Sequence, residues 1–437
     1  MAKSFNKKVI WFFITAFLLR LFLSFYYYHG DVNNHIAWVN FIKDFGLRGF
    51  YESFNLSYFS YPNYPPLAIF SFLSTDFLYE KISLFLWWIN INLPLFPSFL
   101  IPWFKEGGLQ AMMKLPGILA DMGLGALIYY FLKKQKNRFA LWGSFLFLFN
   151  PAVFYLSGLW GQIESLVMFF VFLSLVLLFE KKIIFGILAF VLSLMVKPSS
   201  LIFAPVILIL FLKNKPNFNL YLKTFFSVLF LILLFSLPFF IKEPFSWFFR
   251  FYANIISGPK EMFYLSANAF NFWTLLFGVG QISDKILFKE FLDYRTWGIL
   301  LSLPLFLVVL IKLWQNIKID KVFQACLLIT LIIFLFMTRM HERYLFPVIP
   351  FLAVLTIINS RKFKWAYIFF SLSFLFNLYH NWWIPPINFF INLISNPIFV
   401  KILIGGNLLF FLYLIFYFLD VNWLKKVFKS RLRGKID

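Results

Sequence analysis

The sequence contains 437 residues, of which 62% are hydrophobic and only 13% are charged, and its mean hydropathy is +0.81. A soluble domain needs more charge to cover its surface, so this composition excludes an ordinary soluble protein and predicts an all-α polytopic membrane protein. The single cysteine, Cys326, excludes an intramolecular disulfide and a cysteine-based metal site. The net charge of +22 makes nucleic-acid binding an alternative function. The distribution of the charge along the chain tests this alternative.

Apolar runs along the chain predict about 12–14 transmembrane helices. Twelve predicted crossings lie near 9–28, 112–132, 139–157, 163–180, 183–197, 200–212, 222–241, 296–314, 321–338, 344–359, 364–380 and 402–419. Two further runs, 66–79 and 83–103, are predicted to cross, re-enter or lie in the interface. The first crossing follows Lys3, Lys7 and Lys8 without a cleavage site, which predicts an uncleaved signal anchor.

The charges segregate between alternate loops of this arrangement. One set of loops and tails holds 24 of the 40 lysines and arginines but only four of the 18 acids: Glu180, Asp320, Asp420 and Asp437. This is the pattern of the positive-inside rule, so we expect a protein of the cytoplasmic membrane with both termini in the cytoplasm. The excess of lysine and arginine is then explained by the membrane topology, and no nucleic-acid partner is expected.

Most other polar clusters fall on the opposite, extracytoplasmic side. The two large loops on that side are 29–111, where we expect interfacial helices, and 242–295, where "FSWFFRFYANIISG" predicts an amphipathic interface helix. Because the polar clusters lie on the same side, the sequence predicts one extracytoplasmic site in a single membrane-embedded domain, 1–437.

Asp31 follows the first predicted crossing, in "YHGDVNNHIAW". One interpretation is structural: Gly30 ends the first helix, and the residues from Asp31 to Asn33 cap the next. The other is catalytic, with Asp31 as a general base. If the next helix starts near Asn33, His35, Trp38 and Ile42 share one of its faces.

Three charged residues are predicted at or near membrane depth: Lys114, Asp121 and Lys197. Lys114 and Asp121 are seven residues apart in "KLPGILAD", and therefore share a helix face. An intramembrane carboxylate is usually functional or paired, and Lys197 is a candidate partner for Asp121. Alternatively, Lys197 neutralises an anion in the site or reaches the outer head groups.

The segment "RMHERY" combines Arg339, His341, Glu342 and Arg343 at the mouth of a predicted crossing. The arginines there could bind outer-leaflet phosphates non-specifically. A phosphate clamp in which Glu342 orients one guanidinium explains the composition better. We therefore expect the donor-phosphate residues to be His341, Arg343, Arg339, Lys197 and Lys114.

Candidate substrate-binding residues lie in the outer polar clusters. They are Asn34, His35, Tyr61, Tyr64, Gln162, Glu164, Asn268 and Asn271. Gln162 and Glu164 begin a returning helix, and capping is the alternative for both. Asn268 and Asn271 either present two amides on one helical face or only cap and terminate backbone.

Taken in order, Asp31, "YPPL", "KLPGILAD", "WGQIES", "KPSS" and "HERYL" resemble the GT-C superfamily of polytopic glycosyltransferases, in particular prokaryotic mannosyltransferases related to the second mannosyltransferase of GPI-anchor assembly. The resemblance implies a GT-C type bundle. It also implies inverting transfer of a hexose, expected to be mannose, from a polyprenyl-phosphate donor to an acceptor hydroxyl at the outer face. The acceptor would be a glycolipid, a glycan or a protein.

In that superfamily the first-loop acid is the base, which corresponds to Asp31, and the His-Glu-Arg region lies near the donor phosphate, which corresponds to His341 and Arg343. Asn33 stands where strict Asp-x-Asp members have a second acid. A lone carboxylate is a weak divalent-metal site, so no cofactor is required, and a divalent metal stays an alternative.

Two functions from other classes compete with this one. A transporter or flippase for an anionic lipid or sugar phosphate would also use intramembrane lysines and arginines. It should, however, show polar residues in both membrane halves and often an inverted repeat, neither of which is evident here. An inactive scaffold would tolerate substitution of Asp31 and Arg343.

Overall fold

The computed structural model describes residues 7–53, 61–240, 249, 251–253, 263–280 and 282–420. Its contacts divide the chain into two compact units, Met1–Lys260 and Glu261–Asp437, where the sequence predicts one membrane-embedded domain. Both units consist mainly of helices, and the described strands form one short hairpin.

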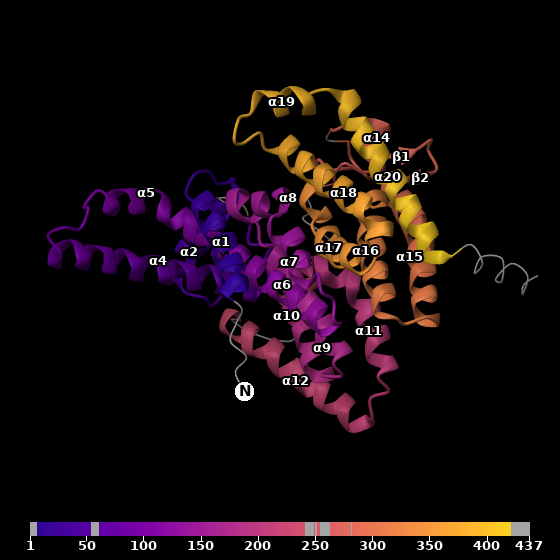
Figure 1. Ribbon diagram of the computed structural model, residues 1–437, viewed down its shortest axis with the longest axis horizontal. Coiled ribbons are helices and arrows are strands. Elements are labelled where there is room, and N and C mark those ends of the chain that lie inside the picture. Colours follow the sequence, from indigo (N-terminus) through magenta and orange to yellow (C-terminus); the bar gives the residue numbers. More distant parts are fainter. Residues whose placement is uncertain are drawn as a thin grey trace, which may run out of the picture. The chain divides into compact units, whose positions relative to one another are not determined.

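The elements described in the first unit are all helices, and α6 packs against α7 and α9, while α9 packs against α10 (Figure 1). Its elements are α1 (Lys7–Ser24), α2 (Asp31–Phe45), α3 (Phe50–Ser53), α4 (Pro66–Asn92), α5 (Leu100–Met113), α6 (Leu115–Lys134), α7 (Ala140–Leu148), α8 (Pro151–Phe154), the π-helix η1 (Tyr155–Trp160), α9 (Glu164–Phe179), α10 (Ile183–Val196), the 3-10 helix η2 (Pro198–Phe203), α11 (Ala204–Lys213), α12 (Phe218–Ser236) and the 3-10 helix η3 (Leu237–Phe239).

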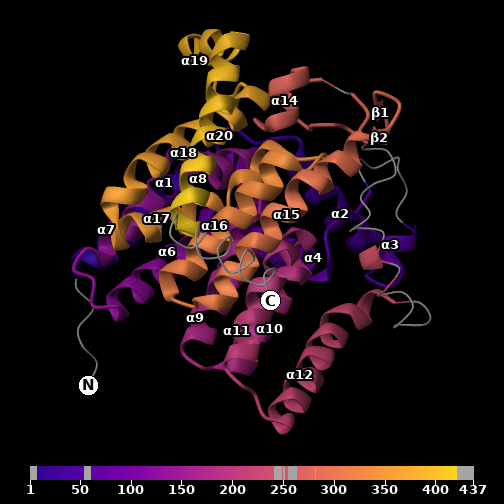
Figure 2. The same cartoon turned by 90° about the vertical axis from the view of Figure 1, so that its right-hand side faces the viewer.

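The second unit is built around α16, which packs against α15, α17 and α20. Its elements are α14 (Phe272–Phe277), β1 (Leu287–Phe288), β2 (Leu292–Asp293), α15 (Tyr294–Gln315), α16 (Ile319–Phe336), the 3-10 helix η4 (Glu342–Leu345), α17 (Val348–Ile358), α18 (Ser360–Asn381), α19 (Asn388–Ile394) and α20 (Pro397–Leu419). In the antiparallel β1–β2 hairpin, Leu287 pairs with Asp293 and Phe288 with Leu292. The hairpin, α14 and α19 lie at one end of this unit (Figure 2).

Five helices of the described residues are long and apolar enough to cross a membrane: α6, α12 with η3, α15, α16 and α20. A sixth span results if α7 and the α8–η1 helix, bent by 49° at Asn150–Pro151, are one crossing. Pro151 has no N–H to continue α7, and the Asn150 side chain instead caps the next helix through Ala152 N. The predicted class, an all-α membrane protein, is confirmed at this level, and the count of 12–14 crossings stays a prediction.

The helix bounds correct the predicted runs in the first loop. Helix α4 continues unbroken from Pro66 to Asn92, whereas the sequence predicts separate runs at 66–79 and 83–103. Between those runs the helix carries Glu80, whose half-exposed carboxylate lies 2.6 Å from Lys43 Nζ. The chain breaks instead at 93–99, which contains two prolines. The interface helix expected in "FSWFFRFYANIISG" lies mainly outside the described residues.

Large apolar side chains are exposed along α4, which packs against α5 in a helical hairpin (Figure 1). The exposed residues of its second half are Leu84, Phe85, Trp87, Trp88 and Ile91. Helix α12 is also apolar, and Thr224 and Ser236 are its only buried residues. Water does not favour exposed apolar surfaces of this extent, so these helices require a lipid environment.

Candidate functional site

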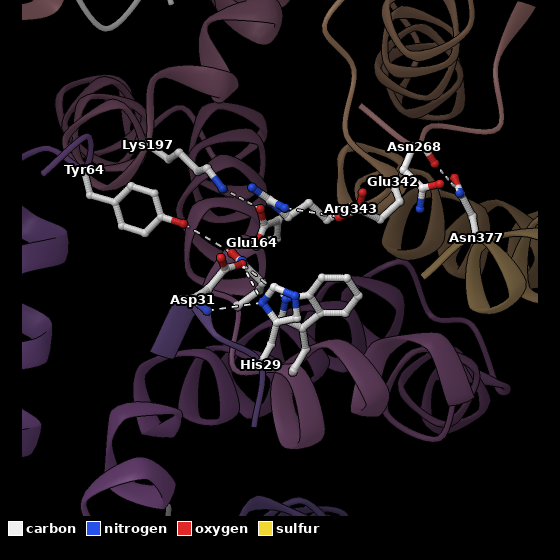
Figure 3. A network of polar contacts seen from close by, with 11 residues as sticks. His29, Asp31, Tyr64, Glu164, Lys197, Asn268, Glu342, Arg343 and Asn377 are labelled. Carbon is white, nitrogen blue, oxygen red and sulfur yellow. Dashed lines mark hydrogen bonds and ion pairs between the residues drawn. The ribbon is translucent and has the colours of Figure 1, made fainter. Parts of the chain in front are cut away.

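Asp31 is the first residue of α2, and its side chain is 27% exposed. Its Oδ2 accepts a hydrogen bond from Trp160 Nε1 at 3.2 Å and another from Gln162 Nε2 (Figure 3). Gly30 occupies the N-cap position, so the predicted cap at Asp31 is displaced by one residue. Gly30 also has φ −53°, which is not the left-handed conformation of a glycine that ends a helix. The carboxylate is therefore held by a distant segment and is still open to solvent or substrate.

The segment that holds Asp31 has an unusual backbone. The π-helix η1 ends at Trp160, and Gly161 follows with φ +93°. A Cβ at Gly161 would lie 2.6 Å from Val32 Cγ2, so only glycine allows the segment to approach the start of α2 this closely. Single π-turns occur frequently at functional sites. Trp160 itself is fully buried, so its ring packs inside the first unit.

His29 is a site residue that the sequence interpretation missed. Its Nδ1 lies 3.3 Å from Asp31 Oδ2 and accepts a hydrogen bond from Asp31 N at 3.2 Å. The ring stacks on Trp160 with a centroid separation of 4.5 Å. In the sequence, only its position two residues before Asp31 indicated that His29 could belong to the site.

A second group of polar residues continues from Gln162. Tyr64 OH lies 3.2 Å from Gln162 Oε1, and Lys197 Nζ donates to Glu164 Oε1 at 2.5 Å. The Lys197 ammonium also lies 5.1 Å from the centre of the Tyr64 ring. Four predicted site residues from three separate sequence clusters thus form one group with Asp31 (Figure 3). Lys197 is paired with Glu164, and not with Asp121 as the structural alternative predicted.

Lys114 does not fit the phosphate-binding role expected for it. It is 1% exposed, and its ammonium donates to Ser24 O at 2.7 Å, to Gly158 O at 3.2 Å and to Tyr27 O. An ammonium has three donors, and all three are used on backbone carbonyls. Lys114 therefore joins the end of α1 to the π-helix, and we assign it a structural role.

Asp121 has an interhelical partner, as one interpretation predicted, but the partner is Arg20. Arg20 Nε lies 2.7 Å from Asp121 Oδ2, and neither side chain is exposed. The hydroxyls of Ser157 and Ser165 also donate to this carboxylate. The sequence interpretation did not single out Arg20, because one basic residue inside an apolar run carries no sign of which helix it faces.

The remaining first-loop candidates lie on or near α2. His35 is 1% exposed and stacks on Phe72 with a centroid separation of 4.0 Å, which suits packing better than the expected substrate contact. His35, Trp38 and Ile42 are all buried, which confirms their predicted common face. Asn34 is partly buried in the first turn of the same helix. Tyr61 is exposed, and its hydroxyl donates to Tyr51 O at 2.7 Å.

In the second unit, Arg343 lies on η4 with Glu342. Arg343 NH1 donates to Glu342 Oε1 at 3.1 Å, so the predicted orienting contact is present. Glu342 is buried, whereas the Arg343 side chain is 16% exposed. The His341 backbone forms bridges with Ala267 and Asn268, and its ring contacts that of Tyr344. The carboxylate thus fixes a guanidinium that still reaches the surface of its unit.

The two predicted asparagines do not share a helical face. Asn268 has φ +66° and precedes α14, whereas Asn271 is the N-cap of α14 and accepts from Thr274 N at 3.0 Å. The capping interpretation is therefore confirmed for Asn271. Asn268 Oδ1 lies 2.8 Å from His380 Nδ1, and Asn377 Nδ2 donates to Asn268 O at 2.7 Å (Figure 3). The sequence interpretation did not assign His380 or Asn377.

Arg339 is occupied by a partner that was not predicted. Its Nε and NH2 lie 2.7 and 3.1 Å from the two carboxylate oxygens of Asp284, which is fully buried. Thr338 OH donates to the same carboxylate at 2.8 Å. This two-point contact directs the Nε–NH2 edge of the guanidinium to a buried carboxylate, whose charge Arg339 neutralises. We therefore assign Arg339 to the attachment of the 263–284 segment.

Among the residues that the structure describes, no group of three histidine, cysteine, aspartate or glutamate side chains is placed to hold a metal ion. Comparison of the sequence with models of protein families finds no match, and comparison with curated proteins finds none either.

Proposed function

We propose that this protein is an inverting glycosyltransferase that uses a polyprenyl-phosphate sugar. The proposed sugar is a hexose, mannose being the expected one, and the acceptor is a hydroxyl at the outer face of the cytoplasmic membrane. The observation that carries the proposal is the Asp31 carboxylate, which is partly exposed and is held by Trp160 and Gln162 in an otherwise apolar helical chain.

The chemistry needs a base for the acceptor. In the proposed reaction the acceptor oxygen attacks the anomeric carbon, a new C–O glycosidic bond forms, and the bond from that carbon to the phosphate oxygen breaks. The hydroxyl proton passes to the Asp31 carboxylate, and the bonding electron pair leaves with polyprenyl phosphate. A partly exposed carboxylate in contact with two donors suits this role, because the donors fix its orientation while an acceptor hydroxyl can still reach it.

The leaving phosphate needs a cation. Arg343 suits this function better than Lys114, which is buried, or Arg339, whose guanidinium neutralises the buried Asp284 carboxylate. Glu342 orients the Arg343 guanidinium through NH1, and the Arg343 side chain is 16% exposed. His341 is the second proposed phosphate ligand. Preoriented cations stabilise charge that develops on a leaving group without reorganisation during the reaction.

The group of Tyr64, Gln162, Glu164 and Lys197 is the proposed sugar-binding region. Lys197 and Glu164 form a close pair of opposite charges, which lowers the attraction of Lys197 for a phosphate. The same pair offers donors and acceptors of the kind that bind sugar hydroxyls. We therefore place Lys197 with the sugar-binding residues in this proposal.

The lipid donor accords with the character of the first unit. Its exposed apolar helices α4 and α12 require lipid, and a polyprenyl chain is most stable in the same environment. The basic loops predicted on the cytoplasmic side assign Asp31 to the opposite side of the membrane.

The test uses the full chain in lipid nanodiscs with polyprenyl-phosphate mannose and a membrane extract as the source of acceptors. We expect sugar transfer by the wild type, and a loss of at least about a hundredfold for Asp31→Asn. Asp44→Asn is the matched control, because Asp44 is an exposed carboxylate on the same helix. Transfer by Asp31→Asn at the wild-type rate would remove Asp31 as the base. Lipid or sugar-phosphate flux through vesicles, without transfer from any polyprenyl-phosphate hexose, would favour the transporter.

A further inference from the structure

Asp121 joins three elements of the first unit through one carboxylate. Its Oδ2 accepts from Arg20 Nε on α1 at 2.7 Å and from the Ser157 hydroxyl in the π-helix at 2.6 Å. Its Oδ1 accepts from the Ser165 hydroxyl in the first turn of α9 at 2.5 Å. None of these four side chains is more than 1% exposed.

The network satisfies the charges that it buries. Arg20 also donates to Leu148 O at 2.7 Å and to Ala16 O at 3.1 Å. Replacement of a buried ion pair by apolar residues is often neutral or stabilising, so a pair of this kind is weak evidence for a role in stability alone. The location of the Arg20–Asp121 pair is therefore more informative than its contribution to the stability of the fold.

The two serines flank the segment that holds Asp31. Ser157 lies three residues before Trp160, and Ser165 lies three residues after Gln162. Both donors to the Asp31 carboxylate are therefore enclosed between two contacts with Asp121. A small displacement of either contact would move the indole or the carboxamide, and with them the base.

Helix α6 follows this segment for two turns. Lys114, at its N-cap, binds Gly158 O, and Asp121 binds the two serines. Between them, a Cβ at Gly117 would lie 2.5 Å from Gln162 O, so the helix backbone lies directly against Gln162. Positions 114, 117 and 121 share one helix face. This face of α6 supports the whole 157–165 segment.

We infer that Asp121, with Arg20 as its counter-ion, is a positioning residue for Asp31. It fixes Ser157 and Ser165, and thereby the Trp160 and Gln162 side chains that orient the Asp31 carboxylate. The inference rests on the proposed function, because it assigns Asp31 the role of base. Asp121 itself is fully buried and does not contact a substrate.

Serine variants test this without leaving a buried charge unpaired. Ser157→Ala, Ser165→Ala and the double variant each keep the Arg20–Asp121 pair. We expect kcat to fall about 10- to 100-fold in the double variant, as for groups that orient catalytic ligands, while KM for the donor changes less than about twofold. Asp121→Asn should have a larger effect, but it leaves Arg20 without its counter-ion and is therefore only a supporting variant.

Ser144→Ala is the matched control. Ser144 is also a fully buried serine, and its hydroxyl donates to Gly125 O on the same helix α6 at 2.7 Å, but it does not bind Asp121. Its loss should lower the unfolding temperature as much as the loss of Ser157 or Ser165, with kcat unchanged. An equal fall of kcat in Ser144→Ala would show a general structural effect and would overturn the inference.

Hydrogen–deuterium exchange provides a readout that is independent of activity. We expect backbone amides of 155–165 to exchange about fivefold faster in Ser157→Ala/Ser165→Ala than in the wild type, and at the wild-type rate in Ser144→Ala. Unchanged exchange, or faster exchange with unchanged kcat, would overturn the positioning role. If the wild type transfers no sugar at all, the proposed function fails, whereas the exchange measurement still shows whether Asp121 holds the segment.

Discussion

The indole nitrogen of Trp160 lies 3.2 Å from the carboxylate of Asp31, although 129 residues separate the two in the sequence. The Trp160 side chain is fully buried, so the hydrogen bond to Asp31 gives its only polar atom a partner. An indole N–H can donate but not accept, so in this contact the Asp31 carboxylate oxygen is the acceptor.

Trp160→Phe removes this donor and retains an aromatic ring of similar packing. A hydrogen bond to a charged group contributes about 1.5 kcal/mol or more, so we expect kcat to fall about tenfold. Steady-state transfer assays on the folded protein measure this effect. Trp142→Phe, at an exposed tryptophan of α7, is the control and should leave kcat unchanged. Equal rates for both variants would show that Trp160 is only a packing residue.

Lys114→Met tests the structural role assigned to that lysine. The substitution keeps most of the side-chain length but leaves three backbone carbonyls without their shared donor, at a cost of about 2 kcal/mol. We expect a lower midpoint in thermal unfolding and an unchanged affinity of the folded protein for polyprenyl phosphate.

Lys105→Met is the comparison for Lys114→Met. Lys105 is exposed on α5, so its replacement should alter the unfolding midpoint little. If Lys114→Met weakened binding of the polyprenyl-phosphate donor without lowering the unfolding midpoint, Lys114 would instead be a phosphate ligand.

The sequence predicted the features that depend on composition and on the distribution of charge between loops. Apolar runs predicted the helices, and the segregation of charge placed Asp31, Gln162 and Lys197 in one group. The structure brings those residues together within the first unit. The continuous helix α4 was not predictable in the same way, because apolar runs do not show whether the chain turns between them or continues as one helix.

The partners of buried charges were the least predictable part of the site. Arg20 and Asp121 are 101 residues apart, and Arg339 and Asp284 are 55 apart. Helical spacing tells which residues share a face, but not which helix that face meets. The π-helix at Tyr155–Trp160 was equally hidden, since no residue type marks the change from α to π.

Arg343→Lys tests the proposed phosphate contact. Lysine keeps the positive charge but loses the planar fork that allows one side chain to contact Glu342 and a phosphate together. We expect KM for the polyprenyl-phosphate sugar to rise about tenfold and the unfolding temperature to stay within a degree or two. Arg361→Lys, at an exposed arginine of α18, serves as the control. A KM equal to that of the wild type would remove Arg343 from the phosphate site.

Arg339→Gln should give the opposite result, although Arg339 lies in the same short segment. Its guanidinium neutralises the buried Asp284 carboxylate, so the variant leaves that charge with Thr338 as a neutral donor and should lose about 3 kcal/mol of stability. KM measured on the folded fraction should not change. Arg339→Met combined with Asp284→Leu removes both charges and should recover much of the lost stability. A rise in KM without a loss of stability would instead make Arg339 a substrate ligand, and its contact with Asp284 would then be a means of orienting it, as Glu342 orients Arg343.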